Sequence, residues 1–359
     1  MTTAEIIKYR LYNQHVTHHI HATPGELVAW MGAMQAQDYP GAKWSIALRI
    51  PGCTEADVDR AIAERKIIRT WPMRGTLHFV AAADIRWMLA LMASKVVSGN
   101  AGRRRQLELD DKTMNKSTRL IAKALQGNKQ LTRSEIYDLL DRNGISPKAQ
   151  RGLHILAHLA HTGLICFAAF SEKQPSFALL DEWAPHGAIM HRDEALATAA
   201  VRYFNSHGPA TLRDFVWWTG LTVTDAKKAV QLAEDELEKI TAGDREYYMA
   251  AGPPEIKTAS GVHLLPGFDE YLLGYTDRSA VLDKAHAPKV VPGNNGMFMP
   301  TIVINGKIGG LWRRHIKKKE VIVESRPFED LSAAKHKAIA AEARKYGKYL
   351  GMDVVYEKK

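Results

Sequence analysis

One order of sequence patterns occurs three times along the chain, and the clearest copy lies in the middle. Residues 116–126 have the pattern of a helix, and a second helix begins at Thr132, with Glu135 three residues later to complete a capping box. A third helix begins at Ser146 and ends at Gly163. The segments "LICFAAF" and "SFALLDEW" then form a hairpin around "SEKQP". Three helices followed by two strands are the order of a winged helix.

The other two copies share this pattern but not the same residues. In the later copy, "EALATAAVRYFNSHG", "ATLRDFVWWTG" and "TVTDAKKAVQLAEDELEKI" predict helices, and short strands run through "YYMAA". The first copy is less regular. Its helices are expected near residues 4–16, 24–36 and 54–65, and "KIIRTWPMRGTLHFV" predicts two strands around Arg74 and Gly75.

After residue 255 the chain becomes rich in strand patterns. "GVHLLPG", "FMPTIVINGKIGGLWRR" and "EVIVESRPF" predict strands, and Asn305-Gly306 between apolar runs indicates a two-residue hairpin turn. A helix over residues 332–350 and a strand in "DVVYE" complete this part. We therefore expect an α+β fold. It consists of three tandem winged-helix units (helix-turn-helix plus β-wing) at 1–100, 101–185 and 186–254, followed by a β-rich C-terminal α+β domain at 255–359.

The chain carries a surplus of positive charge. It has 49 Lys and Arg residues against 39 Asp and Glu residues, a formal net charge of +10 and a pI near 9.4. This balance favours a polyanionic partner, because cationic side chains release counterions from phosphates. The candidate phosphate contacts are Arg103, Arg104 and Arg105 in an expected loop, and Arg313, Arg314, Lys317, Lys318 and Lys319 beyond the Asn305-Gly306 hairpin. The alternative for each group is a solvated charged face.

The two cysteines and the hydropathy pattern favour a reducing compartment inside the cell. Cys53 and Cys166 are far apart and belong to no spacing typical of a zinc site or a disulfide framework. The N-terminus lacks a basic segment followed by an apolar run, and no stretch reaches about 18 apolar residues. We expect a cytoplasmic protein with no membrane partner.

The segment "MQAQDYPG" places two glutamines where an apolar helical face would continue. That face follows the i, i+3, i+4, i+7 spacing through Leu27, Trp30, Met31 and Met34. Pro40 and Gly41 place the helix end around Gln37. An extended backbone after Ala36 would let the side chains of Gln35 and Gln37 converge. The alternative is that Gln35 bonds a local backbone group and Gln37 is solvated.

Four segments together carry a family resemblance over almost the whole chain: "MQAQDYPGAKWSIALRI", "IIRTWPMRGTLHFV", "LLPGFDEYLLGYTDRS" and "GMFMPTIVINGKIGGLWRR". They resemble the winged-helix DNA glycosylases of the AlkZ/YcaQ family, which have three tandem winged helices and a β-rich C-terminal domain. The resemblance implies a catalytic Gln-x-Gln motif, as opposed to the Gln-x-Asp motif of another branch. Gln35 and Gln37 match it. It further implies excision of alkylated purines and unhooking of interstrand crosslinks.

The chemistry of a glutamine pair limits the substrate. An amide has no pKa in the useful range and cannot act as a general base, but it can hold a water and stabilise a cationic sugar. N7- and N3-alkylpurines already carry a positive charge and leave without protonation. We therefore expect a monomeric, monofunctional glycosylase that acts on double-stranded DNA containing alkylated or crosslinked purines, in the nucleoid. No lysine is placed for a Schiff base, and no cofactor or metal is expected.

Several other residues have open roles. Asp38 is either a supplementary carboxylate or a solvated helix-end residue. By resemblance Arg74 and His78 belong to the catalytic domain, where Arg74 is a phosphate contact or a solvated turn residue. "FDEYLLGYTDRS" has no derivable role, and a buried pair between Asp277 and Arg278 is one hypothesis.

Three histidines at i, i+4 and i+7, His154, His158 and His161, form either a metal site or, as we favour, a polar face for DNA or another domain. The rival function for the whole chain is a non-catalytic winged-helix DNA-binding protein, either a transcriptional regulator or a binder of damaged DNA. Charge and winged helices fit both functions, and only the glutamine pair separates them.

Overall fold

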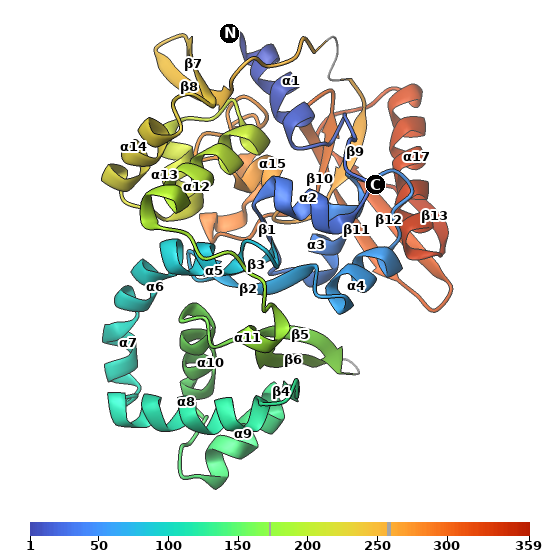
Figure 1. Cartoon of the computed structure of the whole chain (residues 1–359). Coiled ribbons are helices and arrows are strands. Elements are labelled where there is room, and N and C mark those ends of the chain that lie inside the picture. Colours follow the sequence, from blue (N-terminus) through green and yellow to red (C-terminus); the bar gives the residue numbers. More distant parts are fainter. Residues whose placement is uncertain (172–173, 257–259) are drawn as a thin grey trace. The chain divides into compact units, whose positions relative to one another are not determined.

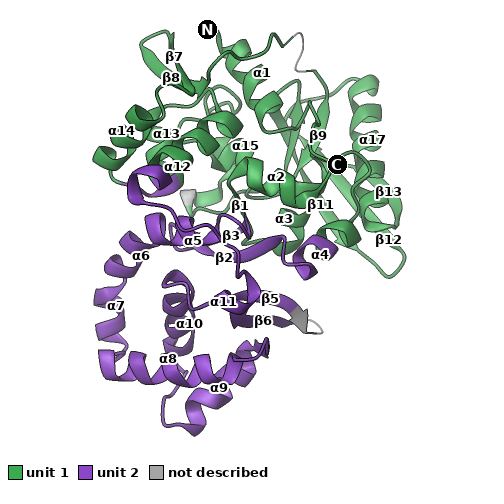
Figure 2. Ribbon diagram, in the orientation of Figure 1, with its two compact units in different colours: residues 1–59, 196–218, 222–359 green, residues 60–195, 219–221 purple. Residues whose placement is uncertain are grey.

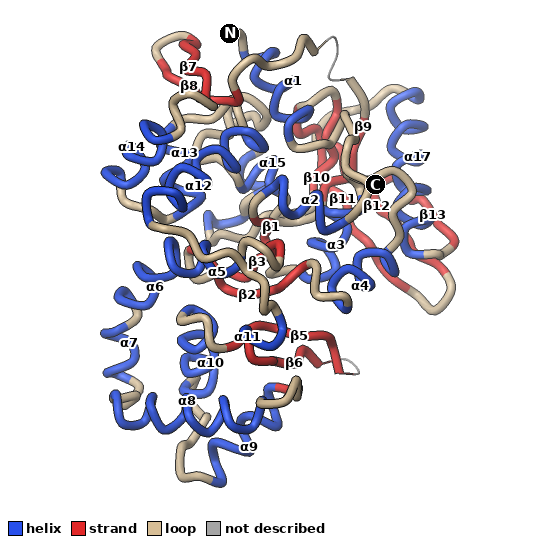
Figure 3. The backbone as a smooth tube through the Cα atoms, in the orientation of Figure 1, coloured by secondary structure: helices blue, strands red, loops and turns tan. Residues whose placement is uncertain are grey.

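The computed structural model describes residues 1–171, 174–256 and 260–359 (Figure 1). The chain divides into two compact units (Figure 2). Unit 1 contains residues 1–59, 196–218 and 222–359, and unit 2 contains residues 60–195 and 219–221. Helices and strands occur in both units (Figure 3), so the fold is mixed α+β. Within the described ranges no helix is both long and apolar enough to cross a bilayer.

Unit 2 begins with a hairpin and continues through a series of helices. Its elements are β2 (Ile67–Met73), β3 (Thr76–Ala81), α5 (Ile85–Met88), the π-helical η1 (Leu89–Ala93), α6 (Ser94–Gly99), α7 (Ala101–Gln106), α8 (Asp111–Leu125), β4 (Leu131–Thr132), α9 (Arg133–Arg142), α10 (Arg151–His161), β5 (Ile165–Ser171), β6 (Gln174–Leu179) and α11 (Leu180–Trp183). Its strands follow the order β3-β2-β5-β6-β4, with every pair antiparallel.

Local signals and a shared core explain this arrangement. The expected capping box begins α9: the Glu135 N–H donates to Thr132 Oγ1 at 3.3 Å and the Thr132 N–H donates to Glu135 Oε2 at 2.7 Å. Helices α8, α9 and α10 bury one apolar face each against β5 and β6, through Ile121, Leu125, Ile136, Leu140, Ile155, Leu159, Phe167 and Phe177. The hairpin expected after α10 is present as the antiparallel pair β5 and β6, and residues 172–173 of the expected "SEKQP" segment lie outside the described residues.

Unit 1 combines segments from both ends of the chain. Its elements are α1 (Thr3–Asn13), α2 (Pro24–Met31), β1 (Ala33–Gln35), α3 (Tyr39–Ala47), α14 (Val223–Leu232), β7 (Leu237–Ala242), β8 (Arg245–Ala250), β9 (Val262–Leu265), α15 (Glu270–Leu273), α16 (Ala287–Val290), the 3₁₀ turn η2 (Pro292–Asn294), β10 (Thr301–Ile304), β11 (Lys307–Ile316), β12 (Glu320–Pro327), α17 (Ala333–Leu350) and β13 (Asp353–Lys358). Three helices contain residues at which the chain passes between the units: α4 (Glu55–Ala63), α12 (Arg192–His207) and α13 (Leu212–Thr219).

A five-stranded sheet of order β13-β12-β11-β10-β9 organises unit 1. Strands β12 and β13 are parallel and are joined by α17, whereas the other pairs are antiparallel. The predicted Asn305-Gly306 turn is confirmed, with φ of 49° and 81° at its two residues. A side chain at position 306 would also collide with Ile7, so α1 packs against this turn because position 306 is glycine.

Some sequence expectations about secondary structure were wrong. The helix expected over "TVTDAKKAVQLAEDELEKI" ends at Leu232, and its last residues belong to β7. The helix expected over residues 24–36 ends at Met31, because Gly32 adopts φ 74° and stops it, and the chain then enters β1. Pro40 lies in the first turn of a new helix, α3, where its missing N–H costs nothing. Arg103, Arg104 and Arg105, expected in a loop, lie on the short helix α7.

Candidate active site

The two glutamines of the motif lie in different surroundings. Gln35 ends β1 and is 7% exposed, whereas Gln37 precedes α3 and is exposed. The backbone N–H of Gln37 donates to Gln35 Oε1 at 3.1 Å. This is the local backbone contact considered above as the alternative to convergence. Gln35 therefore uses its side-chain carbonyl oxygen to hold the backbone of Gln37, and Gln37 is an exposed residue of unit 1.

A buried carboxylate lies behind the motif. Glu270, the first residue of α15, is 1% exposed, and its Oε1 accepts the backbone N–H of Gln35 at 3.0 Å. Its Oε2 accepts the Trp218 Nε1–H at 3.0 Å and lies 3.4 Å from His207 Nε2. Both oxygens therefore accept hydrogen bonds inside unit 1, as a buried carboxylate requires. Sequence reasoning missed this residue.

Asp38 is held by an arginine from the far end of the chain. Arg314 on β11 lies 3.1 Å from Asp38 Oδ2 and 3.2 Å from Oδ1 through one guanidinium nitrogen. Asp38 is the N-cap residue of α3 but makes no side-chain capping bond. A Cβ at Gly41 would strike the Asp38 carboxylate, so the glycine leaves room for this pair. Asp38 is thus an ion-paired residue next to the motif rather than a solvated one, and its partner Arg314 comes from β11.

The remaining cations of the C-terminal group line the β11–β12 hairpin. Arg313 faces Glu324 in the strand register and is exposed. Lys317, Lys318 and Lys319 are exposed at the turn, where Lys317 Nζ lies 2.7 Å from Glu320 Oε1. The hairpin therefore presents positive charge at its end, whereas Arg314 is engaged at the motif.

Arg74 and His78 interact directly in unit 2. Arg74 occupies the β2–β3 turn with φ 55°, and one of its guanidinium nitrogens lies 3.1 Å from His78 Nε2. His78 is fully buried, and its Nδ1 lies 3.0 Å from the Thr76 carbonyl oxygen. A neutral imidazole that donates from Nδ1 and accepts at Nε2 satisfies both contacts. Arg74 is thus partly buried and positioned by the histidine, and it is not a solvated turn residue.

The three arginines of α7 differ in their surroundings. Arg103 donates to Gln150 Oε1 at 3.1 Å. Arg104 lies 3.0 Å from His158 Nδ1, whereas Arg105 is exposed. Burial, followed by the charge of Arg104, lowers the pKa of His158. Arg104 is therefore part of the contact between α7 and α10, and Arg103 and Arg105 are the members of this group with exposed side chains.

The histidines of α10 do not form one exposed polar face. His161 is 6% exposed, and its ring lies 6.4 Å from that of Trp71 within the core of unit 2. Leu153, on the same helix, is 44% exposed. The expected polar face is thus wrong at His161, because the buried side of α10 includes this residue. In the described part of the chain, no three His, Cys, Asp or Glu side chains gather as metal ligands.

Replacing His161 with phenylalanine is expected to reduce the acid sensitivity of folding. Burial lowers the pKa of His161 to about 4 from its ordinary 6.5, so the unfolded chain binds more protons between these values. The free energy of unfolding of the wild type must therefore fall as the pH drops from 6.5 towards 4. We expect His161→Phe to remove about 1–2 kcal/mol of this loss between pH 7 and pH 4.5.

Urea unfolding at a series of pH values measures this difference. The exposed His191 provides a matched control, and His191→Phe should leave the pH dependence close to that of the wild type. An equal pH slope in the wild type and in His161→Phe would show that His161 gains no proton on unfolding.

The segment "FDEYLLGYTDRS" links distant parts of unit 1. Asp269 forms a buried bidentate pair with Arg49, at 2.8 and 2.9 Å, and accepts a hydrogen bond from Ser45 Oγ at 2.6 Å. The hypothesised pair of Asp277 with Arg278 is replaced by other contacts. Asp277 forms an ion pair with Arg245, the first residue of β8. Arg278 Nε donates to the Leu272 carbonyl oxygen at 2.7 Å.

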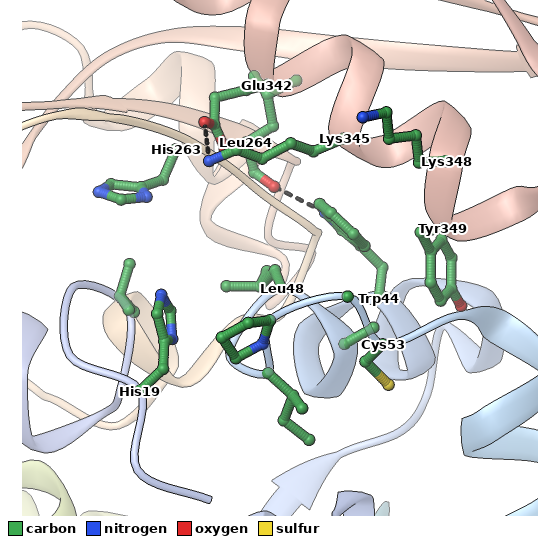
Figure 4. A pocket seen from close by; sticks show the side chains of 15 residues that line it. His19, Trp44, Leu48, Cys53, His263, Leu264, Glu342, Lys345, Lys348 and Tyr349 are labelled. Atoms are coloured by element: carbon green, nitrogen blue, oxygen red, sulfur yellow. Dashed lines mark hydrogen bonds and ion pairs between the residues drawn. The ribbon is translucent and has the colours of Figure 1, made fainter. Parts of the chain in front are cut away.

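A cavity of about 440 Å³ lies elsewhere in unit 1 (Figure 4). Its lining includes Trp44, whose Nε1–H donates to the Leu264 carbonyl oxygen at 2.8 Å, and the Glu342–Lys345 pair at 2.6 Å. Burial lowers the pKa of His263 to about 4 and raises the pKa of the Cys53 thiol to about 11, so both are uncharged at neutral pH. The described residues that line this cavity include neither motif glutamine, so it is distinct from the candidate active site.

Comparison with known families identifies the class of protein. The model of a family described as "DNA glycosylase AlkZ-like" matches residues 28–349, which is most of the chain and includes both motif glutamines. The chain therefore belongs to the AlkZ-like DNA glycosylase family. The resemblance drawn from the four sequence segments is confirmed.

Two comparisons with Streptomyces sahachiroi, one of sequence and one of structure, show how far the likeness extends. The "Interstrand DNA cross-link repair glycosylase" of this organism is 27% identical in an alignment of 353 residues that covers 94% of each chain. The solved structure of the Streptomyces sahachiroi DNA glycosylase AlkZ matches with a TM-score of 0.80 and 24% identity over 99% of each chain. This second likeness shows that the mixed α+β fold of the two proteins is shared over their whole length.

Proposed function

We propose that this chain is a monofunctional DNA glycosylase that hydrolyses the N-glycosidic bond of cationic N7- and N3-alkylpurines in base-excision-type repair. The observation that carries the proposal is the exposed amide of Gln37, whose backbone is held by Gln35 Oε1 at 3.1 Å. Such an amide can orient a water and stabilise positive charge on the sugar. It cannot remove a proton, so it suits a base that leaves easily because it is already cationic.

The proposed substrates include crosslinked purines. The Streptomyces relative bears the name of an interstrand crosslink repair glycosylase, and the two chains align over nearly their full lengths. A purine joined to the opposite strand through N7 carries the same positive charge as a monoadduct. The same departure of a neutral base would therefore release one end of the crosslink.

The DNA contacts of this proposal come from the cationic groups described above. We assign phosphate contacts to Arg74, which His78 positions, to Arg103 and Arg105 on α7, and to Arg313 on the β11–β12 hairpin. Arg104, which joins α7 to His158 on α10, and Arg314, which is paired with the Asp38 carboxylate, would act by shaping their surroundings. We propose three winged-helix units at 1–100, 101–185 and 186–254 and a C-terminal domain at 255–359, and the order of three helices followed by two strands in the second and third of these segments supports this division. We propose a monomer that works in the nucleoid without metal or cofactor.

The first experiment is release of 7-methylguanine from duplex DNA by the purified protein. We expect release of 7-methylguanine, and no release of uracil or 8-oxoguanine from matched duplexes, because neutral bases need an acid that the motif does not provide. Borohydride should trap no covalent complex with DNA, because hydrolysis without a lysine nucleophile forms no Schiff base.

The rival function gives a different result in the same assay. A regulator would bind one duplex sequence far more tightly than others and release no base. Efficient excision of uracil would contradict the proposed mechanism directly. Absence of 7-methylguanine release together with cleavage of a larger cationic adduct would restrict the substrate class to bulky lesions.

A further inference from the structure

The backbone of the Gln-x-Gln segment is held by two consecutive hydrogen bonds in unit 1. The Gln35 N–H donates to the buried Glu270 carboxylate at 3.0 Å, and the Gln37 N–H donates to Gln35 Oε1 at 3.1 Å. The position of Gln37 therefore depends on Gln35, whose own position depends on Glu270. A carboxylate is a stronger acceptor for a backbone N–H than a neutral carbonyl oxygen.

Glu270 is itself fixed by its surroundings. Trp218 donates to its Oε2 at 3.0 Å, and His207 lies 3.4 Å from the same oxygen. The His207 ring stacks on that of Tyr203, with centroids 4.8 Å apart and an interplanar angle of 11°. A Cβ at Gly274 would lie 2.6 Å from the His207 ring, so glycine at this position allows the close packing.

The neighbouring residue anchors the start of α15. Asp269 Oδ1 accepts the Tyr271 N–H at 3.0 Å, as expected of an N-cap residue, and both of its oxygens bind Arg49. Asp269 and Glu270 thus point to different partners: one secures the helix, and the other reaches the motif. The two adjacent carboxylates therefore make two separate sets of contacts.

We propose that Glu270 is a positioning residue for base excision: it holds the Gln35 backbone so that the Gln37 amide faces the substrate. The inference rests on the proposed function of Gln37. It assigns a role to the acidic residue of "FDEYLLGYTDRS" that touches the motif. Small displacements of a positioned group cost large factors in rate, so a residue that never touches DNA can still govern turnover.

The Glu270→Gln variant tests the proposal because it keeps the size of the side chain. Glutamine has one acceptor oxygen for two donors, the Gln35 N–H and the Trp218 Nε1–H, so one of these donors must face its NH₂ group. We expect a single-turnover rate of 7-methylguanine release about 10- to 100-fold below the wild type. Duplex affinity, measured by fluorescence anisotropy, should change less than about threefold because Glu270 is buried.

A second substitution distinguishes positioning from loss of packing. Trp218→Phe removes the indole N–H that competes with the Gln35 N–H for the single oxygen of the new glutamine. The Glu270→Gln/Trp218→Phe double variant should therefore release base at nearly the rate of Trp218→Phe alone. A structural effect would instead make the double variant slower than either single variant. A wild-type rate in folded Glu270→Gln, or no recovery in the double variant, would overturn the proposal.

Hydrogen exchange gives a readout that does not depend on catalysis. In Glu270→Gln, the amides of the segment 33–37 should exchange at least tenfold faster than in the wild type, while the amides of α17 keep their protection. If the wild type releases no base, the proposed function fails, yet exchange still tests whether Glu270 holds the segment. Unchanged exchange at Gln35 would overturn the positioning role even in an active enzyme.

Discussion

Gln37→Ala is expected to lower the single-turnover rate of 7-methylguanine release by about 100- to 1000-fold, which is typical for the loss of one positioned polar group. In the proposed mechanism the exposed Gln37 side chain faces the sugar and a water, and alanine offers neither a donor nor an acceptor. The backbone bond of residue 37 to Gln35 Oε1 does not involve the Gln37 side chain, so the segment should keep its shape. Duplex affinity should therefore stay near that of the wild type.

Two further variants make this result specific. Gln35→Ala removes the oxygen that holds the Gln37 N–H, and we expect a smaller loss of about tenfold from misplacement of an intact amide. Gln126→Ala, at an exposed glutamine after α8, controls for amide removal as such and should release base at the wild-type rate. Equal rates for Gln37→Ala and wild type would exclude a catalytic role for this side chain, whereas a parallel loss of DNA binding would indicate a contact role.

Capping and turn signals in the sequence predicted many of the helices and strands, but they gave the wrong secondary structure around the Gln-x-Gln motif. The capping box at Thr132 and Glu135 and the Asn305-Gly306 turn depend on neighbouring residues, and both are present as predicted. Around the motif, the apolar spacing that continues to Met34 suggested one helix, yet Gly32 ends it and Pro40 begins another. Both signals were readable, because glycine commonly ends helices and proline commonly begins them.

Long-range partners could not be predicted from one sequence. Glu270 and Gln35 are 235 residues apart, and Arg314 and Asp38 are 276 residues apart. No periodicity connects positions at such separations, because they meet only in the folded unit 1. One signal was available: Asp269 and Glu270 interrupt an apolar stretch, and buried carboxylates need nearby donors. That signal predicts partners without identifying them.

Arg49→Met is expected to lower the free energy of unfolding by about 3–5 kcal/mol, because it leaves the buried Asp269 without its charge partner. Arg49 is fully buried and Asp269 is 4% exposed. The guanidinium also donates to the Gln14 carbonyl oxygen at 2.8 Å, and this acceptor would lose its partner as well. Urea unfolding followed by circular dichroism and by tryptophan fluorescence measures the loss, since both probes should move to lower urea together.

A double substitution separates the buried charge from packing. Replacing both members, as in Arg49→Met/Asp269→Leu, removes the unpaired charge, so much of the stability should return even though the pair is gone. Arg344→Met, at an exposed arginine on α17, is the matched control and should change the unfolding free energy by less than about 0.5 kcal/mol. A double variant no more stable than Arg49→Met would mean that the specific geometry of the pair, rather than the isolated carboxylate, sets the cost. Asp269 is the N-cap residue of α15, the helix that carries Glu270. The double variant should therefore release base more slowly than the wild type even where its stability has returned.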